Sequence, residues 1–374
     1  MMRILFTLVW ALGIAPLFAQ VSINMQARID TVEIDKYKLV HHDDATGLSQ
    51  QLLEMPIGDY KIINERIAKQ LQKETITKVE LVYTDYPKGS DMRELNRARI
   101  LELYIHLPQV FNKRVIEWKV VKQTGAKNND MASHMIHGFV ITYRPLPSFE
   151  AENNLISSVL EGKTNPDSTI LKVLERHPNW KDQIVVCDVT GSMSPYLASL
   201  VLWLKLNNSN KLSENFVFFN DNDMDHNKQE KLDTSGIWDV SSKKYDAVLK
   251  KMLYAMYNGG QTENNLKATF YASQKFMKEK KKEGIIMIAD NWQDPYDMKL
   301  LPALKEIGVP IHVIVCGVSA TLNPNYLDIA LATNGSVHTI EADLEELAKI
   351  SEGKTVKFGT FKLKMTNGKL VPMK

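Results

Sequence analysis

The chain has 374 residues, which is enough for two or three domains. Hydrophobic residues make up 44% and charged residues 24% of it, as in an ordinary folded protein, and the formal net charge of +2 is too small to indicate binding to nucleic acid or to an anionic membrane surface. Its two cysteines, Cys187 and Cys316, exclude a disulfide framework. Both lie in apolar runs without a histidine pattern, so we expect buried free thiols and no zinc site.

Residues 1–19 have the pattern of a secretory signal peptide. Arg3 gives a positive start, residues 4–18 are almost wholly apolar, and the small Ala19 precedes a plausible cleavage point. An uncleaved membrane anchor is the alternative, although the run is barely long enough to span a bilayer. No later stretch is long and apolar enough to cross a membrane. We therefore expect an exported protein of the periplasm or cell envelope, without an integral membrane segment after signal removal.

Residues 20–48 are polar and weakly patterned, and we expect an irregular lead-in. Residues 49–146 alternate between helical and strand patterns, which predicts a small α/β domain. The expected helices span residues 62–72 and 92–107, the second ended by Pro108, and the expected strands span residues 78–83, 115–121 and 138–143. A connector with several prolines follows at residues 147–180. It carries one short helix over residues 168–176, capped by Asp167.

Residues 181–350 alternate between apolar strands and helices. Continuous apolar strands such as IIMIA at residues 285–289 are typical of a parallel sheet covered on both faces. The expected strands span residues 183–187, 215–219, 236–240, 284–289, 311–318 and 336–340, and the expected helices span residues 195–206, 242–256, 263–280, 296–307, 325–332 and 344–349. The pattern predicts an α/β domain with a doubly wound, mostly parallel sheet. Residues 351–374 predict a β-hairpin with a tight turn at Asn367-Gly368.

Oxygen-bearing side chains follow two of these strands at the point where each strand ends. Asp188 ends the first strand, and Thr190 and Ser192 follow at alternate positions. Thr262 lies in a glycine-rich loop that opens a helix, and Asp290 ends a later strand. Carboxylates and hydroxyls are hard ligands that suit Mg2+, Mn2+ or Ca2+. Because ligands in doubly wound folds gather at the carboxyl ends of the strands, we expect these five side chains to share one metal site.

This region resembles the von Willebrand factor A domain with its metal-ion-dependent adhesion site. The family's Asp-x-Ser-x-Ser motif matches Asp188, Thr190 and Ser192, with threonine in place of the first serine, and the family's loop threonine and second aspartate match Thr262 and Asp290. The resemblance implies that Thr190 and Ser192 ligate the metal directly or through water, whereas the two aspartates act largely through water and hydrogen bonds. It also implies a protein partner that presents a carboxylate to the metal.

The same residues are compatible with other structures and functions. The segment from Asp188 to Ser192 is also compatible with a simple helix-capping turn, or with a scaffold whose metal site no longer works. A phosphatase of the haloacid dehalogenase type is rejected, because Thr190 stands where that chemistry needs a second aspartate. Residues 221–225 imitate the start of an EF-hand loop but lack its glycine and its twelfth ligand, so a solvated acidic loop is favoured over a second calcium site.

Residues 49–146 resemble, more weakly, the outer membrane protein A-like peptidoglycan-binding domain. The matching segments are INERIAKQL, VELVYTD and LNRAR, at residues 63–71, 79–85 and 95–99. The resemblance implies that Asp85 and Arg97 hold the diaminopimelate of the peptidoglycan stem. The residues by themselves also fit a turn aspartate and a solvated helix arginine.

The sequence supplies no nucleophile with a paired base, so we expect a binding protein and not an enzyme. The favoured hypothesis is an exported bacterial cell-envelope protein whose A-type domain holds a divalent metal, Mg2+ or else Mn2+ or Ca2+, and engages an acidic group on a protein partner. The alternative is a peptidoglycan-associated structural scaffold with a non-functional metal site.

Overall fold

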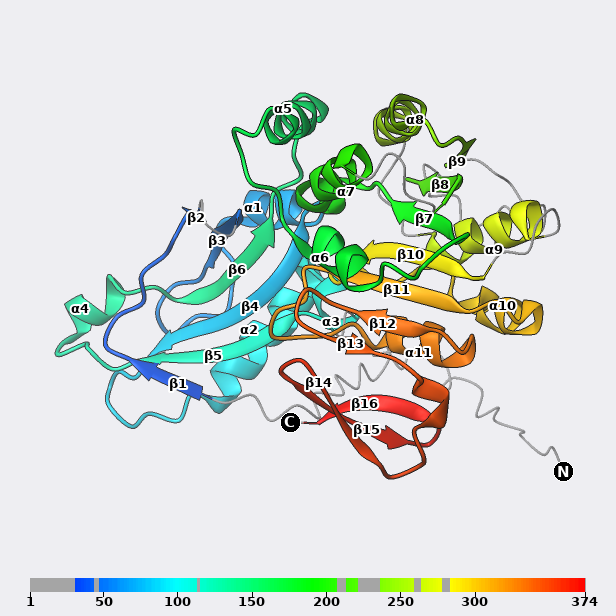
Figure 1. Ribbon diagram of the computed structural model, residues 1–374. Coiled ribbons are helices and arrows are strands. Elements are labelled where there is room, and N and C mark those ends of the chain that lie inside the picture. Colours follow the sequence, from blue (N-terminus) through cyan, green and yellow to red (C-terminus); the bar gives the residue numbers. More distant parts are fainter. Residues whose placement is uncertain are drawn as a thin grey trace, which may run out of the picture.

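The chain forms two α/β domains that lie side by side, followed by a small C-terminal sheet (Figure 1). The computed structural model describes residues 31–43, 47–112, 115–206, 213–220, 236–258, 264–277 and 283–373. The expected signal peptide at residues 1–19 lies outside the described residues. Within the described part, no helix is both long and apolar enough to cross a membrane.

The N-terminal domain is built on a six-stranded mixed sheet, drawn in blue, cyan and green in Figure 1, with the strand order β1-β5-β4-β6-β3-β2. The β1–β5 and β5–β4 pairs are parallel and the remaining pairs are antiparallel. The strands are β1 (Thr31–Ile34), β2 (His42–Asp43), β3 (Leu48–Glu54), β4 (Thr75–Thr84), β5 (Glu117–Gln123) and β6 (Gly138–Arg144). The helices are α1 (Glu65–Leu71), α2 (Arg93–His106), α3 (Gln109–Asn112) and α4 (Asn129–Ser133). Leu71, Leu103 and Val110 of the first three helices form the main core with β3, β4 and β6.

The irregular lead-in that we expected at residues 20–48 is corrected by the structure, because strands β1 and β2 lie within it. β1 pairs with β5 and β2 pairs with β3, so both are edge strands of the sheet. Three of the four β1 residues are exposed, and β2 has only two residues. Such short, solvated strands lack the apolar alternation from which a strand is predicted.

The C-terminal domain is built on a seven-stranded sheet with the order β13-β12-β11-β10-β7-β8-β9. The five inner strands are parallel, and the two edge strands, β9 and β13, are antiparallel to their neighbours. The strands are β7 (Ile184–Asp188), β8 (Asn215–Phe219), β9 (Ile237–Ser241), β10 (Ile285–Asp290), β11 (Ile311–Cys316), β12 (Ser336–His338) and β13 (Asp343–Leu344). The predicted fold class, an α/β protein with a mostly parallel sheet preceded by a smaller α/β domain, is therefore confirmed.

Helices cover both faces of this sheet, as its continuous apolar strands require. Side chains such as Val186 and Met287 pack with α9 (Asn265–Phe276), α10 (Leu301–Ile307) and α11 (Pro324–Ala332). Cys187 and Ile288 face the other way, toward α5 (Phe149–Leu160), α6 (Thr169–Arg176), α7 (Ser194–Leu206) and α8 (Tyr245–Tyr257). Cys187 and Cys316 are buried free thiols, as expected, and burial raises the pKa of each well above its ordinary value.

Two expectations for the C-terminal domain are corrected. Residues 147–180 are more than a connector, because α5 and α6 pack Ile156, Val159 and Val173 into the core beneath α7. The helix expected at residues 344–349 is instead the end of β13 followed by a 3-10 turn at Leu347–Lys349. Glu346 adopts a left-handed backbone conformation there, with φ of 53°, which interrupts any helix.

The expected C-terminal hairpin is present and gains a third strand. It consists of β14 (Thr355–Phe358), β15 (Phe361–Thr366) and β16 (Lys369–Met373) in antiparallel order. Asn367 and Gly368 form the predicted tight turn, with φ values of 52° and 70°. The Glu352 carboxylate accepts hydrogen bonds from both turn amides, which holds the turn in place.

Candidate metal centre

The two strand-terminal aspartates lie at one edge of the C-terminal sheet. Asp188 ends β7 and Asp290 ends β10, and these two strands are parallel neighbours, paired from Ile184 and Ile285 onward. The chain therefore brings both carboxylates to the same carboxyl edge. Thr190 and Ser192 lie in the turn between β7 and α7, which includes a short 3-10 segment at Gly191–Met193.

Hydrogen bonds join these four side chains into one cluster. The Thr190 amide donates to Oδ1 of Asp188 at 2.8 Å. The Thr190 and Ser192 hydroxyl oxygens are 3.0 Å apart, and the Ser192 hydroxyl donates to Oδ2 of Asp290 at 2.5 Å. None of the four residues is more than 1% exposed. The structure thus brings together four of the five predicted ligands, whereas Thr262 lies outside the described residues, as does the acidic segment 221–225.

The loop after β10 fixes the orientation of the Asp290 carboxylate. Its Oδ1 accepts hydrogen bonds from the backbone amides of Trp292 and Gln293, at 2.6 and 3.3 Å. Asn291 connects this loop with the loop after β11, because its side chain donates to the Thr321 carbonyl and accepts from the Asn323 amide. Asn291 is fully buried and is a supporting residue that sequence analysis did not identify as such. The side chains around the cluster are thus held in place before any ligand arrives.

The donor set fits a hard divalent cation. It consists of carboxylate and hydroxyl oxygens, which are the ligands that Mg2+, Mn2+ and Ca2+ prefer. Two buried carboxylates in one cluster are costly to ionise without compensating positive charge. A bound divalent cation would supply that charge, and it would act as a Lewis acid toward one further oxygen ligand.

Two residues of the cluster line a small cavity between the two domains. The cavity has a volume of about 180 Å³. Thr190, Gly191 and Ser192 line one side of it, and Lys73 and Glu74 of the N-terminal domain line the other. The candidate metal centre therefore faces the N-terminal domain.

The two residues predicted to bind peptidoglycan also meet in one place. Asp85 and Arg97 line a larger cavity of about 830 Å³ between the end of β4 and α2. The Asp85 carboxylate accepts from the Gly89 amide at 2.8 Å and lies 3.8 Å from the Lys122 ammonium. The Arg97 guanidinium is mostly exposed and contacts Glu94 at 3.4 Å. Both charges are accessible from the cavity, with the carboxylate partly held by its own turn.

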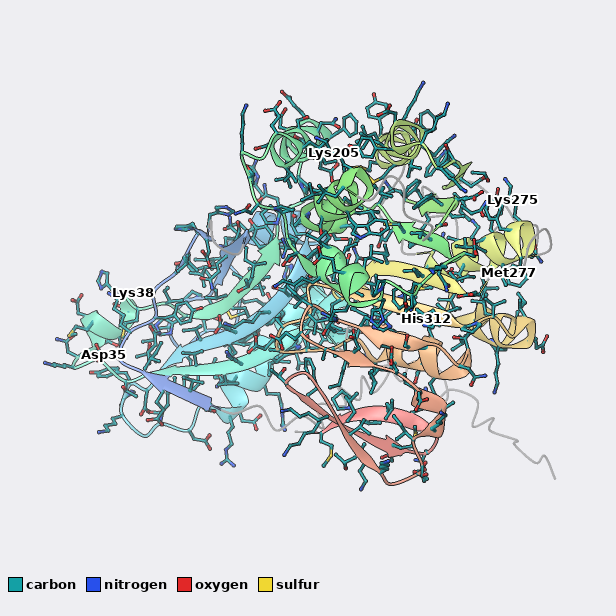
Figure 2. All side chains as sticks on the ribbon, viewed as in Figure 1. Asp35, Lys38, Lys205, Lys275, Met277 and His312 are labelled. Carbon is teal, nitrogen blue, oxygen red and sulfur yellow. The ribbon has the colours of Figure 1, made fainter. Side chains whose placement is uncertain are left out.

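A second polar cluster, which sequence analysis missed, joins α6 to the edge of the same sheet. The Ser336 hydroxyl lies 2.5 Å from Nε2 of His338, and Nδ1 of His338 lies 2.8 Å from the Asp343 carboxylate. Arg176 donates two hydrogen bonds to Asp343, at 2.7 and 3.0 Å. His312, labelled in Figure 2, lies 2.6 Å from the Ser336 hydroxyl.

The order serine, histidine, aspartate is that of a hydrolytic triad, but the surroundings favour a structural role. Ser336 is 4% exposed and His338 is fully buried, so a substrate has no access to the hydroxyl. Burial lowers the pKa of His338 and lowers that of His312 to about 4, which keeps both rings neutral. Burial alone would raise the pKa of Asp343, but hydrogen bonds from His338 and Arg176 hold it well below its usual range. The cluster could not be identified from the sequence, because only tertiary contacts bring α6 and β11 to the β12–β13 segment.

Comparison with known protein families gives no matching family, and comparison with curated proteins gives no match either.

Proposed function

We propose that this chain is an exported binding protein of the bacterial cell envelope, that its C-terminal domain holds a divalent cation, and that the cation engages a carboxylate on a protein partner. The observation that carries the proposal is the single cluster of buried oxygens from Asp188, Thr190, Ser192 and Asp290 at the carboxyl edge of the sheet. The resemblance of this residue pattern to the adhesion site of von Willebrand factor A domains supports the same assignment.

The chemistry of the cluster favours binding over catalysis. Thr190 and Ser192 would offer a divalent cation neutral hydroxyl oxygens as ligands, and the carboxylates of Asp188 and Asp290 accept hydrogen bonds from backbone amides. A cation whose coordination is incomplete attracts an acidic group from outside the cluster. The residues of this chain would hold and orient the cation, and a carboxylate of the partner would supply a further ligand.

Calorimetric titration with Mg2+, Mn2+ and Ca2+ tests the metal site. Asp188→Asn keeps the size of the side chain and removes its charge, so we expect no measurable metal binding by this variant. Asp246→Asn, on the exposed first turn of α8, is the matched control and should bind as the wild type does. A wild-type protein that binds none of the three metals, or an Asp188→Asn variant that binds them normally, would contradict the proposal.

A second candidate function, a scaffold anchored to peptidoglycan, is favoured by the shared cavity of Asp85 and Arg97. A carboxylate and a guanidinium facing one cavity suit a zwitterionic ligand such as the free end of an amino-acid stem. Co-sedimentation with isolated peptidoglycan tests this function. Arg97→Ala should reduce binding, whereas Arg66→Ala, which removes an exposed arginine from α1, should not. Equal binding by both variants would refute the role of Arg97.

A further inference from the structure

The surroundings of the candidate metal centre indicate which carboxylate reaches it first. The cavity that Thr190 and Ser192 line is bordered on its far side by Gln72, Lys73 and Glu74 of the N-terminal domain. Among the described residues that line this cavity, Glu74 carries the carboxylate. A volume of about 180 Å³ accommodates a cation with a few water molecules, at roughly 30 Å³ per water. It is too small for a folded segment of an outside protein.

Glu74 is held at this position by local structure. It follows the end of α1, where its amide donates to the Leu71 carbonyl at 3.2 Å, and it directly precedes β4. Its Oε2 accepts a hydrogen bond from the Leu146 amide at 3.3 Å, and the side chain is half-buried. Leu146 in turn packs closely against Gly191, which lies between Thr190 and Ser192. A Cβ atom added to Gly191 would lie only 3.1 Å from Cδ2 of Leu146. The glycine thus permits a close approach of the segment that positions Glu74.

Further contacts hold the domains together beside this cavity. The Thr321 hydroxyl donates to the Val115 carbonyl at 2.9 Å. The Arg144 guanidinium lies 6.0 Å from the centre of the Trp292 ring, and the Trp292 amide binds the Asp290 carboxylate. An outside partner that approaches the cluster through this cavity therefore meets the N-terminal domain beside it.

We infer that Glu74 is the carboxylate that the metal centre engages in the isolated chain, so that the cation fastens the two domains together and an acidic partner has to displace Glu74. This inference rests on the proposed function, since it assumes that the cluster binds a divalent cation. It adds that the site is capped by its own chain, and that an acidic partner competes with Glu74 for the cation.

Titration of the full chain with Mg2+ and Mn2+ tests the inference through the variant Glu74→Gln. This variant keeps the size of the side chain and removes its charge, and we expect metal affinity to fall about tenfold or more, because one anionic ligand is lost. Glu65→Gln, on the exposed first turn of α1, is the matched control and should keep the wild-type affinity. Thermal unfolding without metal checks that both variants fold.

Hydrogen exchange gives a second measurement that does not depend on affinity. Metal should slow exchange at the amides of Lys73 and Glu74 in the wild type, because the end of α1 becomes fixed to the other domain, and it should not do so in Glu74→Gln. If Glu74→Gln binds metal as tightly as the wild type while Asp188→Asn does not bind, the metal site stands and the internal cap is refuted. If the wild type itself binds no metal, both proposals fail.

Discussion

Replacing Thr190 by valine removes its hydroxyl and keeps the shape of the side chain, whereas replacing it by serine keeps the hydroxyl and removes a methyl group. Thr190 is 1% exposed, so each change is felt in a closely packed environment. Its hydroxyl oxygen lies 3.0 Å from that of Ser192, which donates to Asp290. The two variants therefore separate the part of Thr190 that can bind metal from the part that only packs.

The two substitutions should cost similar amounts of stability in the absence of metal. Thr190→Val loses the hydrogen bond between the Thr190 and Ser192 hydroxyls, a net cost of about 1 kcal/mol. Thr190→Ser loses one buried methyl group, also about 1 kcal/mol. Each should lower the melting temperature of the metal-free protein by roughly 2–4 °C. Metal affinity should differ: Thr190→Val should bind about 10- to 100-fold more weakly, and Thr190→Ser should bind as the wild type does.

Calorimetric titration with Mg2+ and Mn2+, together with thermal unfolding with and without metal, measures both quantities. At a metal concentration about 100 times the dissociation constant, bound metal should stabilise the wild type by about 2.7 kcal/mol. The same stabilisation is expected for Thr190→Ser, whereas Thr190→Val should keep only about 0.4 to 1.4 kcal/mol of it at that concentration. If the two variants gain the same stabilisation from metal, the Thr190 hydroxyl is not part of the site and the reasoning is wrong.

Two pH-dependent predictions concern buried groups away from the metal ligands. Burial raises the pKa of Glu152 to about 7, while a hydrogen bond from Ser194 acts to lower it. Because Glu152 loses its proton more readily in the unfolded chain, the stability of the folded protein falls as the pH rises from about 4.5 to 7. At pH 8, Glu152→Gln should therefore have a higher melting temperature than the wild type and a free energy of unfolding that is larger by up to about 3 kcal/mol. Burial lowers the pKa of His312 to about 4. Because His312 takes up a proton more readily in the unfolded chain, the stability of the folded protein falls as the pH drops from about 6.5 to 4. His312→Asn should therefore lose less melting temperature between pH 7 and pH 4.5 than the wild type does. Glu152→Gln should show little of its advantage at pH 4, and an advantage that persists there would mean that packing and not ionisation causes it. For His312, a pH profile that is unchanged by the substitution would show that another group titrates in that range.

The pattern of apolar residues was enough to predict the C-terminal sheet and the residues at the carboxyl ends of two of its strands. Strands such as Ile285–Asp290 are buried along their whole length, and a continuous apolar run of this kind is typical of a parallel sheet that is covered on both faces. Because parallel strands end at the same edge, the positions of Asp188 and Asp290 in the sequence already indicated that their carboxylates would meet. The turn at Asn367-Gly368 was likewise predictable, since it needs residues that tolerate positive φ.

Elements whose burial depends on a distant partner were not predictable in this way. The strand Thr31–Ile34 is mostly exposed and is fixed by pairing with β5, far along the chain. The helix Phe149–Leu160 lies in a segment whose sequence predicts a connector, and only packing against α7 gives it a place in the core. In both cases the stabilising contact is made with another part of the fold, so the local pattern carries little of the signal.

The sequence by itself determined the chemistry of the candidate site. Local hydrophobic patterns place Asp188 and Asp290 at the ends of two strands, and Thr190 and Ser192 follow in the turn after the first of these. Only the tertiary structure decided what faces that site. Glu74 and Leu146 approach the turn at Thr190–Ser192 from the other domain, and their approach depends on how two complete sheets pack together, which no local pattern of residues records.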